Sequence, residues 1–187
     1  MAKSEALKGK TVVLGVTGSI AAVECVKLAR ELIRHGADVV PVLTKDAMEI
    51  LHPNALQFAT GKNPITKFDG TVPYIELVGT HGRADLLLIA PATSNTIAKI
   101  AMGIDDTTVT TFAQNALGAG IPIMIAPAMH ETMYANPIVA SHLRALEKHG
   151  VEFVAPKMEE EKAKLADIEE IVERVIRRLG TRELVGK

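Results

Sequence analysis

The sequence lacks most of the features that indicate a metal centre, a nucleic-acid partner or a membrane segment. Its single cysteine, Cys25, excludes an internal disulfide and a multi-cysteine zinc site, and no metal site is predicted. Twenty-one Lys and Arg balance 22 Asp and Glu, so charge gives no support to a polyanionic partner such as nucleic acid. No apolar stretch approaches membrane-spanning length, and the first residues lack the apolar core of a signal peptide. These absences predict a soluble, cytoplasmic protein.

Aromatic residues are also scarce, at 3% of the chain with no Trp. Because 48% of the 187 residues are nevertheless hydrophobic, aliphatic side chains and seven Met must fill the core. This composition is typical of an α/β protein whose sheet is rich in Val, Ile and Leu. The length suits one domain.

Short apolar runs alternate with helical patterns along the chain. We expect strands at residues 11–16, 38–43, 85–90, 121–126 and 152–155, and helices at about 20–35, 46–51, 94–103, 137–149 and 168–179. Pro53 either ends a helix or begins one, and the loop-rich stretch 60–78 has a short strand at Tyr74–Leu77. The alternation predicts a Rossmann-like, doubly wound parallel sheet in a flavodoxin-like three-layer α/β/α domain over residues 1–180. Residues 181–187 are expected to be a linker or tail.

Two of the apolar strands end in the same Ala-Pro-Ala sequence and then turn polar. One leads into Thr93-Ser94-Asn95-Thr96, and the other ends at Ala128 and leads into Met129-His130. In open parallel sheets, ligands bind at the carboxyl edge of the strands. We therefore expect these two segments to present hydroxyls, amides and an imidazole to a ligand.

A third polar segment, Thr17-Gly18-Ser19, joins the first strand to a helix, where free N–H groups and the helix dipole favour an anion. The spacing is not that of a dinucleotide fingerprint, and the second strand ends at Thr44 rather than at an acidic residue. Hydroxyls at both junctions suit the single phosphate of FMN better than the pyrophosphate of NAD. The alternative is a tight turn with a helix cap. A further hydroxyl-rich group is either a binding patch or a β-prone surface segment: Thr107, Thr108, Thr110 and Thr111.

Three of these segments together resemble the homo-oligomeric flavin-containing cysteine decarboxylases. They are residues 18–22, 90–99 and 127–134, and the similarity runs from about Thr11 to Leu179. The resemblance is to archaeal members of coenzyme A biosynthesis. It implies an FMN-dependent carboxy-lyase that converts 4′-phosphopantothenoylcysteine to 4′-phosphopantetheine, with the flavin taking up a hydride and returning it after CO2 leaves. It also implies a homotrimer or dodecamer, and the tail resembles the junction to a fused ligase domain.

The resemblance further implies which residues contact the cofactor and the substrate. The FMN phosphate would meet Ser19, Thr44 and nearby amides, and the substrate would meet Met129 and His130. The other expected FMN contacts are Gly18, Ile20, Thr93, Ser94, Asn95, Thr96 and Ala128.

The chain departs from the family at its catalytic residues. Tyr74 stands where the family has a catalytic His before an Ile-Glu-Leu stretch, and a phenol with a pKa of about 10 is no base at pH 7 without a large shift. His81 is the alternative base, or an exposed loop residue. His130 replaces a substrate-binding Asn, as in archaeal relatives, and can bond a carboxylate; the alternative is a structural His. The Tyr74 departure leaves two further hypotheses: an FMN-binding relative with other chemistry (flavin prenyl transfer or flavin reduction), or a non-catalytic flavin-binding subunit.

A Lys- and Glu-rich segment, residues 156–166, stands where other members carry a flap with a catalytic Cys. Archaeal members resemble the version found here. Lys162 and Lys164 are candidates for binding the substrate's carboxylate or phosphate and for donating a proton; the alternative is a solvated charged loop. Cys25 cannot replace the flap Cys, because it lies in the first expected helix and is expected to pack as a small apolar group.

Overall fold

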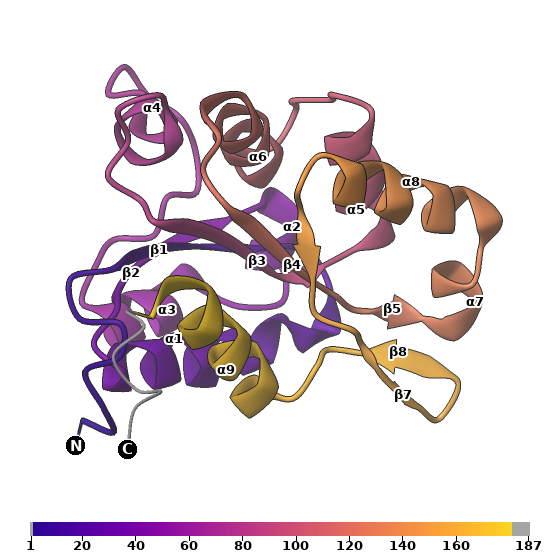
Figure 1. Cartoon of the computed structure of the whole chain (residues 1–187), viewed down its shortest axis with the longest axis horizontal. Coiled ribbons are helices and arrows are strands. Elements are labelled where there is room, and N and C mark those ends of the chain that lie inside the picture. Colours follow the sequence, from indigo (N-terminus) through magenta and orange to yellow (C-terminus); the bar gives the residue numbers. More distant parts are fainter. Residues whose placement is uncertain (1, 181–187) are drawn as a thin grey trace.

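In the computed structural model, which describes residues 2–180, a five-stranded parallel sheet lies between two layers of helices (Figure 1). The strands follow the spatial order β2-β1-β3-β4-β6. This is the 2-1-3-4-5 order of flavodoxin-like folds. The predicted fold class is therefore confirmed. The strand bounds are β1 (Thr11–Val16), β2 (Asp38–Leu43), β3 (Leu86–Ala92), β4 (Ile123–Pro127) and β6 (Glu152–Phe153).

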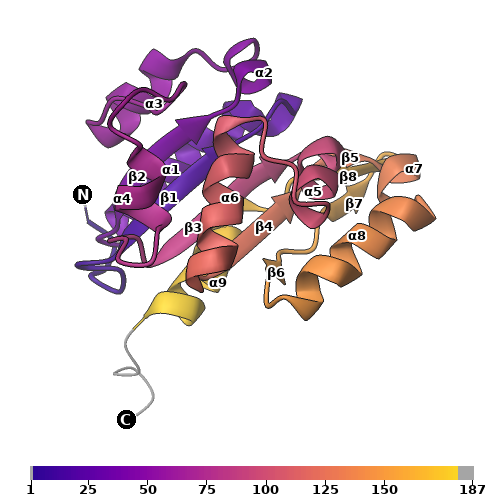
Figure 2. The same ribbon diagram turned by 90° about the horizontal axis from the view of Figure 1, so that it is seen from above.

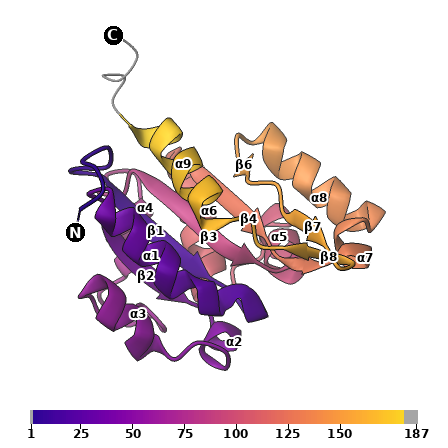
Figure 3. The same cartoon turned by 90° about the horizontal axis from the view of Figure 1, so that it is seen from below.

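Helices cover both faces of the sheet (Figures 2 and 3). One layer contains a 3-10 turn, η1 (Ile20–Glu24), that runs directly into α1 (Cys25–Arg34), together with α3 (Pro53–Thr60) and α9 (Ile168–Leu179). The other layer contains α4 (Pro73–Val78), α5 (Ser94–Ala101), α6 (Thr108–Ala119) and α8 (Pro137–Lys148). Two single turns, α2 (Lys45–Met48) and α7 (Glu131–Tyr134), follow β2 and β5.

The core has two halves because successive strand residues point to opposite faces of the sheet. Leu88 of β3 packs in the half beneath α1 and α9, while its neighbour Ile89 packs in the half beneath α6. Strands buried on both faces explain why the sequence reads as continuous apolar runs rather than as an alternating pattern. Apart from Phe112 of α6, the largest fully buried side chains are Leu and Ile, as the composition predicted.

The predicted strand at Tyr74–Leu77 is wrong, because this segment forms helix α4. Pro73 occupies the first turn, where its fixed φ suits a helix and its missing N–H leaves no bond unmade. Leu77 and Val78 are buried together under this turn, while the Tyr74 ring packs edge-on against Phe68 at a centroid distance of 5.1 Å. Leu77 and Val78 are neighbours in sequence, and in a strand with one solvated face only one of them would be buried, so their joint burial favours the end of a helix.

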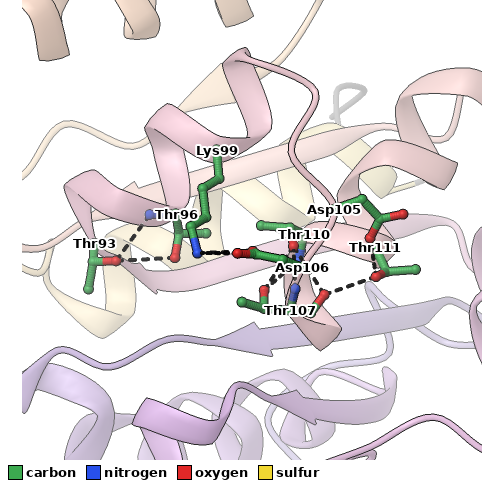
Figure 4. A network of polar contacts seen from close by, with 8 residues as sticks. All are labelled: Thr93, Thr96, Lys99, Asp105, Asp106, Thr107, Thr110 and Thr111. Carbon is green, nitrogen blue, oxygen red and sulfur yellow. Dashed lines mark hydrogen bonds and ion pairs between the residues drawn. The ribbon is translucent and has the colours of Figure 1, made fainter.

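The threonines near residue 110 begin helix α6, which the sequence analysis missed. Thr107 Oγ1 accepts the Thr110 N–H at 3.1 Å, and Thr110 Oγ1 accepts the Thr107 N–H at 2.9 Å (Figure 4). This reciprocal pair is a capping box, and it outweighs the β-propensity of Thr. Thr110 is fully buried, so the interpretation as a β-prone surface segment is wrong.

Two contacts fix the start of α6 near the carboxyl edge of the sheet. Lys99 of α5 forms an ion pair with Asp106 at 2.8 Å, as Figure 4 shows. The Thr108 hydroxyl donates to the carbonyl of Leu43, the last residue of β2, at 2.7 Å. These contacts join α5, α6 and β2 around the same edge.

Residues 156–166 form a hairpin whose charged residues are mostly exposed. Strands β7 (Lys157–Glu159) and β8 (Lys162–Lys164) pair with each other, and β8 pairs with β5 (Met129–His130) to make a small antiparallel sheet in the order β5-β8-β7. Figures 1 and 3 show this sheet beside α7 at the carboxyl edge of β4. Ala163 is fully buried. Three-residue strands rich in charge carry no strand signal in sequence, so only their pairing with β5 defines them.

Two further expectations concern membrane segments and the C-terminal tail, and only residues 2–180 can be compared with them. No helix among residues 2–180 is both long and apolar enough to cross a bilayer. The predicted tail at residues 181–187, including its resemblance to a ligase junction, lies outside the described residues.

Glu31 of α1 is a nearly buried carboxylate held between two cations. It lies 2.6 Å from Lys3 Nζ and 2.6 Å from an Arg34 guanidinium nitrogen. The hydrogen bond from Lys3, with a further one from Arg34, lowers the pKa of Glu31 below its ordinary value of 4.5. The unfolded chain therefore binds this proton more readily, so the stabilisation is present above pH 4.5 and is lost as pH falls through the folded-state value.

We expect Glu31→Gln to lower the free energy of unfolding at neutral pH by about 1–3 kcal/mol, because hydrogen bonds to a charged group are lost. Below pH 4.5 the stability of the variant should fall less steeply than that of the wild type. Urea unfolding at a series of pH values measures both effects. The exposed Glu173, which forms no ion pair among residues 2–180, provides the control Glu173→Gln. Equal pH slopes for wild type and Glu31→Gln would contradict this prediction.

Candidate functional site

A cavity of about 830 Å³ opens at the carboxyl edge of the sheet. Its wall is built from the segments that follow β1, β3 and β4, together with the β7–β8 hairpin and the start of α9. Strand order reverses between β1 and β3, which is where open α/β sheets bind ligands. The lining residues that the sequence analysis singled out are Gly18, Ser19, Ile20, Thr93, Ser94, Ala128, Met129, His130, Lys162 and Lys164.

The segment after β1 provides a helix start at the cavity wall. Ser19 Oγ accepts the Ala21 N–H at 3.4 Å, which caps η1. The Ser19 N–H donates to the Thr17 carbonyl and the Ala22 N–H to the Ser19 carbonyl, both at 2.8 Å, which leaves the Ile20 N–H and the Ser19 hydroxyl as the donors of this turn at the cavity wall. This segment therefore combines the hydroxyl and amide donors that suit a phosphate.

Gly18 allows this segment to lie against α2. A Cβ atom at position 18 would lie 2.5 Å from Asp46 Cβ and 3.3 Å from the Asp46 carbonyl carbon. Neither atom can move without moving the backbone of α2. The absence of a side chain at Gly18 thus sets where Ser19 stands.

Thr17 joins the first segment to the second, a role that the sequence analysis missed. Its hydroxyl donates to the Pro91 carbonyl at 2.8 Å and accepts the Thr93 N–H at 3.1 Å. The side chain is buried, with 1% exposed. The sequence carries one signal for this contact. Thr17 and Thr93 each follow a buried strand, and these strands, β1 and β3, are neighbours in the flavodoxin-like strand order, so the two threonines are expected to lie close together.

The segment after β3 uses its hydroxyls for two purposes. Thr93 Oγ1 accepts the Thr96 N–H at 3.3 Å and so caps α5, and Thr96 is buried behind it. Ser94 is half-buried on the cavity wall, whereas Asn95 is exposed and lies outside the lining. In this chain, Thr93 and Ser94 are thus the residues of this segment that face the cavity.

The segment after β4 is tied to the second segment and to the hairpin. The Ala128 N–H donates to the Ala92 carbonyl at 3.0 Å, so the two Ala-Pro-Ala turns lie side by side. Met129 is half-buried, and His130 is exposed and pairs with Lys162 of β8. The cavity therefore receives an apolar surface from Ala128 and Met129 and an imidazole from His130.

Thr44 lies near this edge but not on the cavity wall. It is buried, its N–H donates to the Val16 carbonyl at 3.1 Å, and its hydroxyl accepts the Ala47 N–H at 3.1 Å. Its observed role is to cap α2, the same turn that Gly18 packs against.

Neither candidate for the family's catalytic His lines the cavity of its own chain. Tyr74 is half-buried in the second core half, beside Phe68. His81 is exposed in the turn before β3, and that turn reaches Asp85, whose N–H donates to the carbonyl of Thr11 at the first residue of β1. His81 therefore precedes the amino edge of the sheet, opposite the cavity.

Cys25 is also separate from the cavity chemistry. Its thiol is fully buried and donates to the Ala90 carbonyl at 3.1 Å. Burial raises the pKa of Cys25 far above its ordinary value, so the thiol stays protonated. The prediction that Cys25 packs as an apolar group is confirmed. Among residues 2–180, no three His, Cys, Asp or Glu side chains are grouped to hold a metal ion.

The residues on the wall fit FMN. Ser19 and Ser94 each begin a helical segment, so a phosphate finds hydroxyl and amide donors there. The close approach that Gly18 permits is to α2, and it fixes the position of the neighbouring Ser19 on the cavity wall. Ala128 and Met129 add the apolar surface that a flavin ring needs.

The fold and the site together define the class of protein. It is an open α/β protein with the strand order of flavodoxin, and a cavity suited to an anion lies where the strand order reverses. The chain belongs to the Flavoprotein family, whose model matches residues 1–180. The predicted resemblance to flavin-containing cysteine decarboxylases is confirmed by the individual relatives.

Among curated proteins, the coenzyme A biosynthesis bifunctional protein CoaBC of Thermococcus kodakarensis is 58% identical over 99% of this chain. The chain spans 46% of that protein, less than half of its length. A probable phosphopantothenoylcysteine decarboxylase of Streptococcus mutans is 34% identical over 89% of this chain and 97% of its own length.

Two solved structures match nearly the whole fold. The FMN-dependent cysteine decarboxylase SpaF has a TM-score of 0.77 at 28% identity and covers 92% of this chain and 98% of its own. A PPC decarboxylase mutant complexed with pantothenoylaminoethenethiol has a TM-score of 0.74 at 26% identity and covers 90% of this chain and 97% of its own.

We expect Gly18→Ala to weaken FMN binding at least about tenfold and to destabilise the fold by about 1–3 kcal/mol, because the new methyl group overpacks against α2. Gly70→Ala is the control, since a Cβ there meets no atom within 4 Å. Flavin fluorescence titration and thermal unfolding measure the two effects. Wild-type affinity and stability in Gly18→Ala would show that the close approach is unimportant.

Proposed function

We propose that this chain catalyses the FMN-dependent decarboxylation of 4′-phosphopantothenoylcysteine to 4′-phosphopantetheine, a step of coenzyme A biosynthesis. One observation carries the proposal: residues 18–20, 93–94 and 128–130, which come from three separate parts of the chain, meet on one cavity wall. These are parts of the three segments that resemble flavin-containing cysteine decarboxylases. The names of the archaeal and streptococcal relatives agree with this reaction.

In this proposal the chain's own residues bind and orient, while FMN, when bound, supplies a reversible two-electron redox centre. Ser19, Ser94 and the amides beside them hold the phosphate end and the polar chain of the cofactor. Met129 and Ala128 pack against its ring. His130, the exposed last residue of β5, lines the same cavity, where it binds the substrate and orients its carboxylate.

The β7–β8 hairpin forms part of the cavity wall. The carbon that loses CO2 must take up one proton to give the product, so the site has to deliver a proton there. The hairpin, which pairs with the strand that carries His130, brings Lys162 and Lys164, the candidate proton donors, to this wall.

Incubation of the FMN-loaded protein with 4′-phosphopantothenoylcysteine tests the proposed reaction. We expect a product lighter by one CO2, detected by mass spectrometry, with no net consumption of an oxidant. A protein that binds FMN and yields no product would refute the proposed activity.

Several expectations from the resemblance remain predictions. They are a homo-oligomer (trimer or dodecamer), a cytoplasmic location, a fused ligase domain of the kind implied by the bifunctional relatives, and catalytic roles for Tyr74 and His81. Because neither Tyr74 nor His81 lines the cavity of its own chain, either role requires a second copy of the chain or a rearrangement.

We expect His130→Ala to retain FMN and to lower kcat/KM for decarboxylation at least about tenfold, because a charge-assisted contact to the substrate is lost. His149→Ala, at the exposed end of α8, is the matched control and should keep wild-type turnover. Steady-state kinetics and the flavin absorption spectrum measure the two effects. If His130→Ala purifies without flavin, its assignment to the substrate side is incorrect.

A further inference from the structure

The β7–β8 hairpin places a row of charged side chains on the cavity wall. In the antiparallel register His130 lies opposite Lys162, Lys162 lies opposite Glu159, and Lys157 lies opposite Lys164. Directly paired residues share a face, as do residues two apart along a strand. These five side chains therefore occupy one face of the small sheet, and all five residues line the cavity.

Two of the three lysines on this face are neutralised by carboxylates. Lys164 Nζ lies 2.9 Å from Glu160 and 3.3 Å from Glu159, and these partners raise the pKa of Lys164 above its ordinary value. Lys157 Nζ lies 3.8 Å from Asp167 and 3.9 Å from Glu159. The charges of Lys157 and Lys164 are thus paired with carboxylates of the hairpin and of Asp167.

Lys162 differs from them. Among residues 2–180, its ammonium group forms no ion pair and no hydrogen bond, although Glu159 is its cross-strand neighbour. The fourth lining lysine, Lys27, is paired with Glu169 at 3.3 Å. Of the lysines on the described cavity wall, Lys162 is therefore the one that forms no ion pair within 4 Å, although its charge acts on Glu160 from a greater distance and helps to lower the pKa of that carboxyl.

The turn of the hairpin keeps Lys162 beside His130. Glu160 and Glu161 both have positive φ, at 51° and 57°, as a two-residue hairpin turn of type I′ requires. This conformation is unfavourable for Glu, and it is held by the Lys164–Glu160 pair and by the Glu161 carbonyl, which accepts the Glu131 N–H at 3.1 Å.

We propose that Lys162 is a substrate-binding residue whose ammonium group, next to the imidazole of His130, captures an anionic group of the substrate. The inference rests on the proposed function, since 4′-phosphopantothenoylcysteine carries two such groups, a carboxylate and a phosphate. Lysine suits either as a compact point charge. Lys164, by contrast, is a positioning residue, because its partners are the carboxylates of the hairpin.

Binding measurements on the FMN-loaded full chain test this role without requiring turnover. Three ligands are used that cannot be decarboxylated, because each lacks either the thiol or the carboxylate of the cysteine moiety. 4′-Phosphopantothenoylserine carries both the carboxylate and the phosphate, pantothenoylserine carries the carboxylate alone, and 4′-phosphopantetheine carries the phosphate alone. The variants are Lys162→Met, Lys162→Arg and, as control, Lys148→Met on the exposed end of α8. Calorimetry gives the affinities, and thermal unfolding checks the fold.

We expect Lys162→Met to bind 4′-phosphopantothenoylserine about tenfold to a hundredfold more weakly, while Lys162→Arg and Lys148→Met stay within about threefold of wild type. If Lys162 binds the carboxylate, Lys162→Met also loses affinity for pantothenoylserine. If Lys162 binds the phosphate, the variant instead loses affinity for 4′-phosphopantetheine. Either pattern supports the proposal. Wild-type affinities of Lys162→Met for all three ligands would overturn it.

Failure of the proposed function is distinguishable from failure of this inference. A wild-type protein that binds 4′-phosphopantothenoylserine but does not decarboxylate the cysteine compound refutes the reaction and leaves the role of Lys162 to be decided by the affinities. A wild-type protein that decarboxylates, with Lys162→Met equal to it in affinity and in KM, refutes the role of Lys162 alone.

Discussion

The site depends on the hydrogen bonds of one buried hydroxyl, that of Thr17. It bridges the ends of β1 and β3, where the strand order of the sheet reverses. A buried hydroxyl without partners costs free energy, so this one constrains both chain segments to the distance at which its two bonds form. The helix starts at Ser19 and Ser94 are thereby held on the wall of one cavity. Ala128, bonded to Ala92, adds the third segment to the same frame.

A second constraint acts on the far side of the cavity, where the hairpin pairs with β5. The pairing of Met129 and His130 with β8 brings the charged face of β7 and β8 to the cavity wall. Carboxylates of the hairpin and Asp167, which precedes α9, form ion pairs with Lys157 and Lys164, whereas Lys162 of the same hairpin forms none within 4 Å among residues 2–180. In the proposed function, the residues that hold the flavin are therefore built on the central sheet, and those that meet the substrate are built on a small sheet attached to it. This division agrees with a family in which a shared cofactor serves different substrates.

Much of this arrangement was predictable from local patterns. Apolar runs with polar ends identified β1, β3 and β4 and placed Ser19, Ser94 and His130 at the carboxyl edge, because parallel strands put their carboxyl ends together. The patterns failed at Tyr74 and at Thr107–Thr111, where β-branched or aromatic residues suggested extended chain. In α6 a capping box between Thr107 and Thr110 decided the conformation, and in α4 the burial of Leu77 and Val78 did. Local propensity is weak enough for such contacts to override it.

The sequence by itself determined the α/β class, the succession of the main strands along the chain and the family, because these depend on hydrophobic periodicity and on short motifs that can be compared directly. Only the tertiary structure decided which hydroxyls face the cavity, since Thr44 and Thr96 differ from Ser19 and Ser94 in their partners rather than in their residue type. The tertiary structure also placed Tyr74 and His81 away from the cavity and distinguished Lys162 from Lys164. Such distinctions rest on contacts between residues far apart in the chain, or on side-chain pairing within a hairpin, and no local pattern encodes them.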